Sequence, residues 1–171
     1  MVAALEVYVD PAASRRIRNL WAALDADGVL SVGSLMQGLH WPHVSLAVAD
    51  RLEPEVVAGA LDGLPIAPPL SLTFQFVGQF LGRVLWLGPA PSALLLAHQS
   101  TVYERLTAAG IEVWDHYRPE RWVPHTTLAM RVPNPVMGTA VRRCLEVLPI
   151  EADLVSAAIA DHSQGLRRML T

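Results

Sequence analysis

Apolar and polar residues alternate along several short stretches of the chain, a pattern typical of strands that bury one face. Gly- and Pro-containing segments separate many of these stretches, as turns do. We therefore expect strands over residues 4–10, 43–49, 70–78, 83–87, 125–130, 151–160 and 166–170. The last two would pair as a hairpin around residues 163–165.

Between the strands, apolar residues recur at helical spacing and predict helices over residues 11–24, 53–61, 91–109 and 135–148. In the third of these helices, an apolar stripe is expected to pack on a sheet, and it consists of Leu94, Leu95, Val102 and Leu106. Strands and helices thus follow one another in mixed order.

Two of the expected strands carry nearly the same residues. Residues 42–47 read Pro-His-Val-Ser-Leu-Ala, and residues 124–129 read Pro-His-Thr-Thr-Leu-Ala. Alternation in a strand places His43 with Ser45, and His125 with Thr127, on one face. An imidazole transfers protons near neutral pH, and a neighbouring hydroxyl donates a hydrogen bond to an anionic oxygen. Two copies that meet across a cleft would supply an acid and a base.

A single histidine on a strand is usually a structural residue with satisfied hydrogen bonds, and repetition argues against that interpretation here. Pro-His-x-Ser/Thr-Leu occurs by chance on the order of once in several hundred proteins of this length, and a second copy is far rarer. Each repeated strand is also flanked by elements of similar kind. We infer an internal duplication, with two lobes that each contribute one histidine strand to a shared groove and are related by an approximate two-fold.

Composition limits the class of protein to which such a site can belong. Hydrophobic residues make up 52% of the 171 residues and charged residues 17%, which indicates one compact domain over residues 1–171 with a packed core. The net charge of -3 argues against a large basic surface for duplex nucleic acid. Cys144 is the single cysteine, so neither a disulfide within the chain nor a cysteine-based metal site is expected. With no signal-like start and no membrane-length apolar run, we expect a cytoplasmic protein that does not bind membranes.

The paired motifs resemble the His-x-Thr/Ser motifs of the two-histidine (2H) phosphoesterase superfamily, specifically its 2'-5' RNA ligase-like branch. Residues 76–80 and 84–88 are similar to the middle hairpin of that family, and residues 121–124 are similar to its approach to the second motif. The resemblance implies an α+β fold that is bilobal, with two antiparallel sheets and flanking helices related by a pseudo-two-fold around a central cleft. It also implies that His43 and His125 are catalytic and that Ser45 and Thr127 bind the phosphate. Ser45 departs from the common Thr but keeps the hydroxyl.

The resemblance implies a phosphodiesterase that hydrolyses a 2',3'-cyclic or 2'-5' phosphodiester of an RNA end or nucleotide, with RNA ligase activity as the reverse reaction. One imidazole would activate water while the other protonates the departing sugar oxygen. No cofactor and no metal is expected, because the sequence lacks local metal-ligand motifs such as His-Glu-x-x-His. No protein partner is implied. The alternatives are a module that binds an RNA end or nucleotide without turnover, and an α+β protein with no phosphate site.

Other side chains are weaker candidates. Tyr117 and Arg121 precede the second motif and would stack on a base or pair with phosphate, although aromatic residues in loops more often close the edge of a core. Arg131 follows the second motif strand and would reach the phosphate. The remaining expectations are a core position for Phe74, Phe76 and Trp41, an exposed His40, and no role for His98 and His162.

Overall fold

The computed structural model describes residues 2–162 and 165–170. Its strands are β1 (Ala3–Val9), β2 (His43–Ala49), β3 (Ser71–Phe80), β4 (Val84–Pro89), β5 (Thr126–Ala129), β6 (Ile150–Asp161) and β7 (Leu166–Leu170). Its helices are α1 (Pro11–Ala26), α2 (Val32–Leu35), α3 (Pro54–Ala60), α4 (Ala93–Ala108), α5 (Asn134–Leu145) and the short 3-10 helix η1 (Asp115–Tyr117). The expected strands and long helices are thus present. Two residues of the predicted β6–β7 turn, Ser163 and Gln164, lie outside the described residues.

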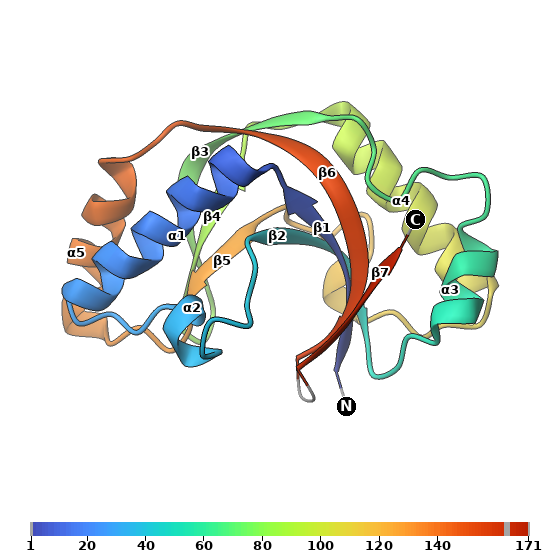
Figure 1. Ribbon diagram of the computed structural model, residues 1–171, viewed down its shortest axis with the longest axis horizontal. Helices are drawn as coiled ribbons and strands as arrows, with labels where there is room; N and C mark the ends of the chain where they lie inside the picture. Colours follow the sequence, from blue (N-terminus) through green and yellow to red (C-terminus); the bar gives the residue numbers. More distant parts are fainter. Residues whose placement is uncertain (1, 163–164, 171) are drawn as a thin grey trace.

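The strands form one antiparallel sheet in the order β2-β1-β6-β3-β4-β5, with β7 paired to β6. The long strand β6 joins its two halves: residues 150–153 pair with β3, and residues 154–161 pair with β1. In Figure 1, β6 arches from one half to the other. The α+β fold with antiparallel strands and flanking helices is confirmed, but the two predicted sheets are halves of one. Their pseudo-two-fold relation stays a prediction.

The sheet is curved, because β2 and β5 stand at opposite ends of the strand order and yet contact each other. These are the two motif strands, and they lie side by side in Figure 1. The strand order by itself would place them at the two far edges of a flat sheet. Curvature therefore brings both histidine motifs into one region of the molecule.

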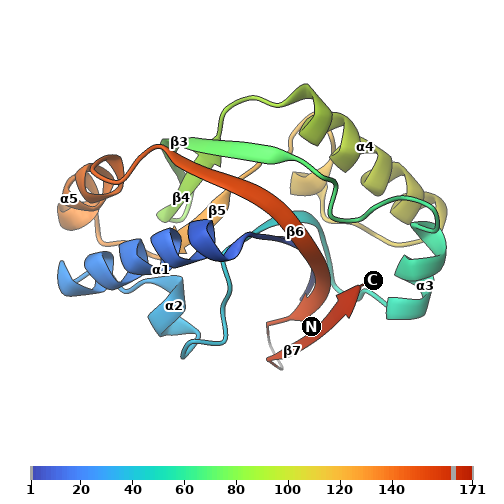
Figure 2. The same ribbon diagram turned by 45° about the horizontal axis from the view of Figure 1, so that its top comes forward.

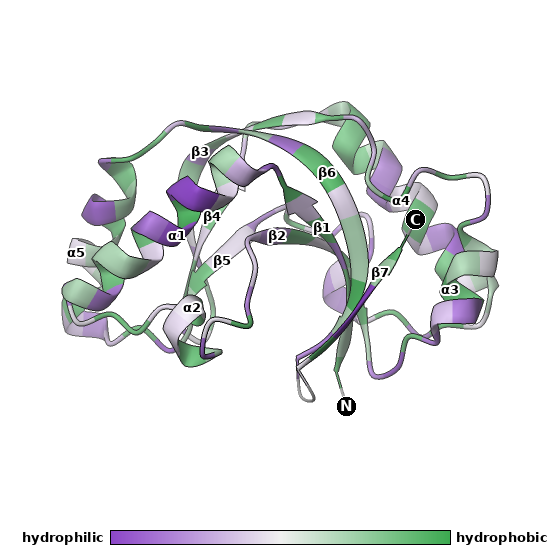
Figure 3. Ribbon diagram, in the orientation of Figure 1, coloured by the Kyte–Doolittle hydropathy of each residue, from purple (hydrophilic) through white to green (hydrophobic). Residues whose placement is uncertain are grey.

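Helices cover the two halves of the sheet separately. Helix α1 packs against β6 and α5, and α5 packs against β3, whereas α4 packs against β2 and α3. Figure 2 shows α1, α2 and α5 at one end of the molecule and α3 and α4 at the other. Hydrophobic and hydrophilic segments alternate along these helices in Figure 3, as expected when one face is buried. The predicted stripe on α4 is correct for Leu95, Val102 and Leu106, but Leu94 is 69% exposed.

Strand β3 departs from simple alternation. Leu72 and Phe74 are buried, but Phe76, predicted for the core, is 49% exposed. The register with β4 shifts between Phe74 and Phe76, which is a β-bulge. One extra residue reverses the alternation, so Phe76 and Phe80 lie on the face opposite to Phe74. The strand also runs two residues beyond the predicted end at Gly78.

No helix among the described residues is long and apolar enough to cross a membrane.

Candidate active site

The first motif shares one face of the sheet with two polar residues of β1. In the antiparallel register, Tyr8 pairs with His43 and Glu6 pairs with Ser45. Val44, between the two motif side chains, is fully buried on the other face. Alternation in both strands therefore gathers an imidazole, a carboxylate and two hydroxyls on a single face.

The His43 ring has an oxygen at each nitrogen. Its Nδ1 lies 2.7 Å from the carbonyl oxygen of Trp41, and its Nε2 lies 3.2 Å from Oε1 of Glu6. Both oxygens accept hydrogen bonds, because one belongs to a carbonyl and the other to a carboxylate. Each nitrogen of the His43 ring therefore faces a hydrogen-bond acceptor.

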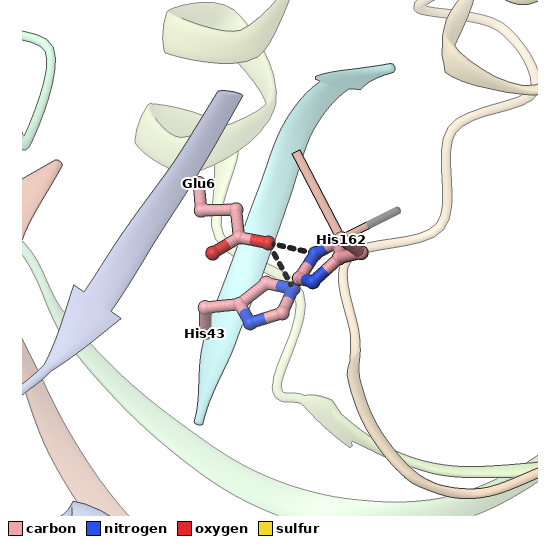
Figure 4. A group of neighbouring side chains, drawn as sticks. All are labelled: Glu6, His43 and His162. Atoms are coloured by element: carbon pink, nitrogen blue, oxygen red, sulfur yellow. Dashed lines mark hydrogen bonds and ion pairs between the residues drawn. The ribbon is translucent and has the colours of Figure 1, made fainter. Parts of the chain in front are cut away.

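Glu6 is completely buried, and three side chains among the described residues bond to it. Its Oε1 contacts Nε2 of His43 and, at 2.6 Å, Nε2 of His162, while its Oε2 accepts a 2.5 Å hydrogen bond from the Tyr8 hydroxyl. Figure 4 shows both imidazoles directed at the same carboxylate oxygen. Burial raises the pKa of Glu6, but the two histidines and Tyr8 together outweigh burial and lower this pKa to about 2. The carboxylate is therefore ionised at neutral pH, and the hydrogen bond to Glu6 raises the pKa of His162.

Three further side chains enclose this group. The His40 ring lies 4.9 Å from the ring of His43, centroid to centroid, and burial followed by the charge of His43 lowers the pKa of His40 to about 3. The predicted exposure of His40 is therefore wrong, and this imidazole is neutral. Trp41, predicted for the core, is 41% exposed and lies beneath the guanidinium of Arg167, 4.3 Å from its ring centroid.

The second motif places its histidine among aromatic rings. The ring centroid of His125 lies 4.8 Å from that of Phe80 and 6.0 Å from that of Trp86. Its Nδ1 donates a 2.7 Å hydrogen bond to the carbonyl oxygen of Val123, which leaves Nε2 as the nitrogen without hydrogen in the neutral ring. Burial and then the nearby charge of His43 lower the pKa of His125 against the opposing effect of the Val123 carbonyl. This imidazole is neutral at neutral pH.

The two motifs thus share local geometry and differ in environment. In each, Nδ1 bonds to the carbonyl two residues earlier at 2.7 Å. Ser45 pairs across the ladder with the ionised Glu6, whereas Thr127 pairs with Trp86. A carboxylate oxygen therefore faces the ring of His43, whereas burial disfavours a proton on His125. Two imidazoles in such different environments can take different roles in proton transfer.

Buried hydrogen bonds connect the strands that carry the motifs. The indole Nε1 of Trp122 donates to the carbonyl of Ser45 at 3.0 Å. The Gln99 amide donates to the carbonyls of Leu46 and Tyr117, at 3.1 and 2.7 Å. Burial raises the pKa of Tyr117 to about 12, although a hydrogen bond with Ser45 opposes this rise. The segment before the second motif is therefore bonded directly to the first.

A hollow of about 460 Å³ lies beside the second motif. Its lining includes Phe80, Trp114, Tyr117, Arg121, Trp122 and His125. Tyr117 and Arg121 were predicted to contact substrate, and the structure places both here; the Arg121 guanidinium pairs with Asp115. Arg131 lies outside this lining, exposed beyond the end of β5 in left-handed backbone (φ 56°).

Glu6, Tyr8 and His162 were missed by sequence analysis. A signal existed for the first two, since Glu6 and Tyr8 share one face of an otherwise apolar strand. For His162, which was assigned no role, no local pattern existed. It reaches the site because β6 crosses beside β1.

Comparison with known proteins gives one family and one fold. Residues 9–166 match the sequence profile of the family described as the 2'-5' RNA ligase superfamily. The structure is similar to that of E. coli LigT in apo form, with 18% identity, coverage of 99% of this chain and 92% of LigT, and a TM-score of 0.66. It is similar to E. coli LigT complexed with 3'-AMP (17% identity, coverage of 98% and 92%, TM-score 0.66) and to a phosphoesterase (19% identity, coverage of 98% and 92%, TM-score 0.65). Among curated proteins, none matches the sequence significantly.

Proposed function

Because the chain belongs to the 2'-5' RNA ligase superfamily, a family of two-histidine phosphoesterases, we propose that it hydrolyses the 2',3'-cyclic phosphodiester of an RNA end or nucleotide. The observation that carries this proposal is the pair of imidazoles on contacting strands, one bound to a carboxylate and the other enclosed by aromatic rings. Such a pair supplies an acid and a base without further groups.

The environments of the two histidines suggest their roles. Nε2 of His125 takes a proton from water as the water oxygen attacks phosphorus. As the bond between phosphorus and one ribose oxygen breaks, Nε2 of His43 gives its proton to that oxygen. The product is a ribose with one free hydroxyl and one phosphomonoester, and the two histidines end with exchanged protonation states. Each proton transfer contributes typically 10²- to 10⁴-fold to the rate.

The hydroxyls of Ser45 and Thr127 bind the non-bridging phosphate oxygens, where negative charge develops. Each hydroxyl lies two residues beyond its histidine, Ser45 within β2 and Thr127 within β5. In the hollow beside His125, Tyr117 stacks on a base and Arg121 contacts the substrate phosphate or ribose. A phosphate contact by Arg131 stays a prediction.

Two related activities follow from the same site. When a 5'-hydroxyl replaces water as the nucleophile, the base takes the proton of this hydroxyl and the acid protonates the departing 3'-oxygen, so the cyclic phosphate opens to a 2'-5' linkage. The reverse of this step cleaves a 2'-5' linkage to a cyclic phosphate and a 5'-hydroxyl. Water is the more abundant nucleophile, so hydrolysis is the proposed reaction. The second candidate is a module that binds a nucleotide without turnover. The complexes of E. coli LigT with 3'-AMP, ATP and NADP+ favour a nucleotide as ligand under either proposal.

The test is incubation with 2',3'-cyclic AMP in the presence of a metal chelator, followed by separation of the 2'- and 3'-monophosphates. We expect turnover by the wild-type protein and a loss of at least about 100-fold in kcat/KM for His43→Ala and for His125→Ala. His98→Ala is the matched control, because His98 bonds to the carbonyl of Ile66 in another part of the molecule.

Retention of more than about a tenth of the wild-type rate by either motif variant, with the fold intact by circular dichroism, contradicts the proposed mechanism. Binding of 3'-AMP with no product from any cyclic or 2'-5'-linked substrate supports the binding module instead.

A further inference from the structure

Glu6, His43 and His162 bring three potential metal ligands together. One potential ligand atom from each of these residues lies within 4.8 Å of the other two, and Figure 4 shows both imidazoles directed at the same carboxylate oxygen. We propose that these residues form a binding site for a divalent transition-metal ion, best suited to Zn²⁺, and that an ion bound there inhibits the enzyme. The metal site stands on its own geometry, and the inhibition rests on the proposed function.

Two imidazoles and one carboxylate form a ligand set that zinc takes in proteins, with one coordination position left open. Zinc bonds to such ligands at about 2.0–2.1 Å, so neighbouring donors of a tetrahedral site lie about 3.3 Å apart. Nε2 of His43 already lies 3.2 Å from Oε1 of Glu6. Nε2 of His162 lies closer to that oxygen, at 2.6 Å, and needs to move away by several tenths of an ångström. His162 follows the end of β6 and its side chain is 29% exposed, so its ring is not fully enclosed.

The surrounding hydrogen bonds orient these donors as they do in zinc proteins. The Nδ1 hydrogen of His43 points to the carbonyl of Trp41, which directs Nε2 toward the site. The Tyr8 hydroxyl donates to Oε2 of Glu6, which leaves Oε1 for the ion.

Charge at the site is compatible with a dication. Glu6 contributes a carboxylate to the ligand set. The guanidinium of Arg167, which bonds to the Tyr8 hydroxyl, opposes a cation. Its nitrogens, however, donate to the Tyr8 hydroxyl and to the carbonyl of Leu39, so they do not occupy the space between the three donors.

An ion bound at this site prevents His43 from acting as the proposed general acid. A metal bond uses the lone pair of Nε2 of His43, so that nitrogen carries no hydrogen to give to the departing ribose oxygen. His125 is outside the group and keeps its role as base. Binding therefore stops catalysis by occupying one of the two imidazoles.

The binding test is a titration of the chelator-stripped protein with Zn²⁺ in competition with a colorimetric zinc chelator. We expect one ion per chain, and affinity lowered by more than about tenfold in Glu6→Gln and in His162→Ala. Tyr8→Phe keeps all three ligands and loses only the hydroxyl that orients Glu6, so it should weaken binding by about tenfold even if the buried Glu6→Gln variant fails to fold. His98→Ala, which removes a histidine elsewhere, should bind like the wild-type protein.

The activity test follows hydrolysis of 2',3'-cyclic AMP with and without Zn²⁺. Saturating Zn²⁺ should lower wild-type turnover by at least about 100-fold, and chelator should restore it. In His162→Ala, the ratio of the two rates should approach one at the same Zn²⁺ concentration.

Absence of stoichiometric Zn²⁺ binding, or equal affinity in wild-type and ligand variants, overturns the metal site and leaves a hydrogen-bonded network only. Stoichiometric binding with unchanged or increased turnover overturns the inhibition. If the protein turns over no substrate at all, the binding titration still decides whether the metal site exists. Failure of the proposed function can therefore be distinguished from failure of the metal site.

Discussion

His43 and His125 follow nearly the same local sequence, and their different chemistry comes from the residues around them. The ionised Glu6 stands beside the first, and the rings of Phe80 and Trp86 stand beside the second. A carboxylate favours the charged imidazole, and apolar surroundings favour the neutral one. The proposed division of the two histidines into an acid and a base rests on this difference in surroundings.

The pH dependence of activity tests whether the surroundings of His125 set its pKa. The pKa of His125 is lowered below the ordinary value of about 6.5, chiefly by burial, so the ring stays neutral and able to accept a proton at pH values where free imidazole is charged. As pH falls, activity should therefore be lost only at pH values below the ordinary pKa of histidine. Phe80→Ala admits water to the ring and should move the acid limb of the kcat/KM profile to higher pH.

Phe76→Ala is the control for this measurement. Phe76 lies on the same strand, is similarly large and is 49% exposed, but it does not line the hollow that contains His125. An acid limb that stays in place in Phe80→Ala, or that moves equally in both variants, argues against burial as the cause of the low pKa.

Among the elements, the hairpin of β3 and β4 shapes the surroundings of the second motif. The bulge after Phe74 turns Phe80 toward His125, and Gly78 leaves room for the ring of Trp86. A Cβ atom at Gly78 would lie 2.0 Å from that ring, which is closer than any atomic contact allows. The absence of a side chain at residue 78 therefore positions the aromatic wall of the site.

We expect Gly78→Ala to displace Trp86 and, with it, His125. Overpacking of this kind typically costs about 1–3 kcal/mol of unfolding free energy. A shift of a catalytic group by a fraction of an ångström to an ångström should lower kcat/KM by about 10- to 100-fold. Denaturant unfolding and the cyclic nucleotide assay measure the two effects.

Gly59→Ala is the control variant for Gly78→Ala. Gly59 lies in α3, and a Cβ atom there would meet nothing within 4 Å. Alanine should stabilise this helix by about 0.5–1 kcal/mol with unchanged kcat/KM. Similar losses of stability in the two variants would show that the Trp86 contact is not the reason for glycine at residue 78.

At the scale of the whole molecule, the site exists because the sheet curves until its outermost strands meet. Gln99 of α4 supports this arrangement, since its amide bonds both to β2 at Leu46 and to the segment before β5 at Tyr117. Its side chain is 1% exposed, so water cannot replace these bonds.

Gln99→Leu keeps the size of the side chain and removes both donors. We expect a loss of about 1–3 kcal/mol in unfolding free energy, because two buried carbonyls lose a partner, and a lower kcat/KM as the motif strands separate. Gln79→Leu, at an exposed residue of β3, should change the unfolding free energy by less than about 0.5 kcal/mol. Equal effects in the two variants would contradict a role for Gln99 in joining the motif strands.

The sequence by itself determined the strands, the long helices and the paired His-x-Ser/Thr motifs. These depend on residues a few positions apart, where the two-residue repeat of a strand and the 3.6-residue repeat of a helix act directly. The alternation also placed His43 with Ser45 and His125 with Thr127. It failed at Phe76, because a bulge depends on how β3 pairs with β4 and not on β3 alone.

Only the tertiary structure decided which groups surround each histidine. Glu6 and His162 meet His43 because β1 pairs with both β2 and β6, and Phe80 meets His125 because β3 and β4 bring it there. The curvature that joins β2 to β5 is likewise a property of the whole sheet. Hydrogen bonding and burial set the charge of a side chain, and both depend on residues distant in sequence, so the local pattern identifies a histidine while the fold determines its protonation state.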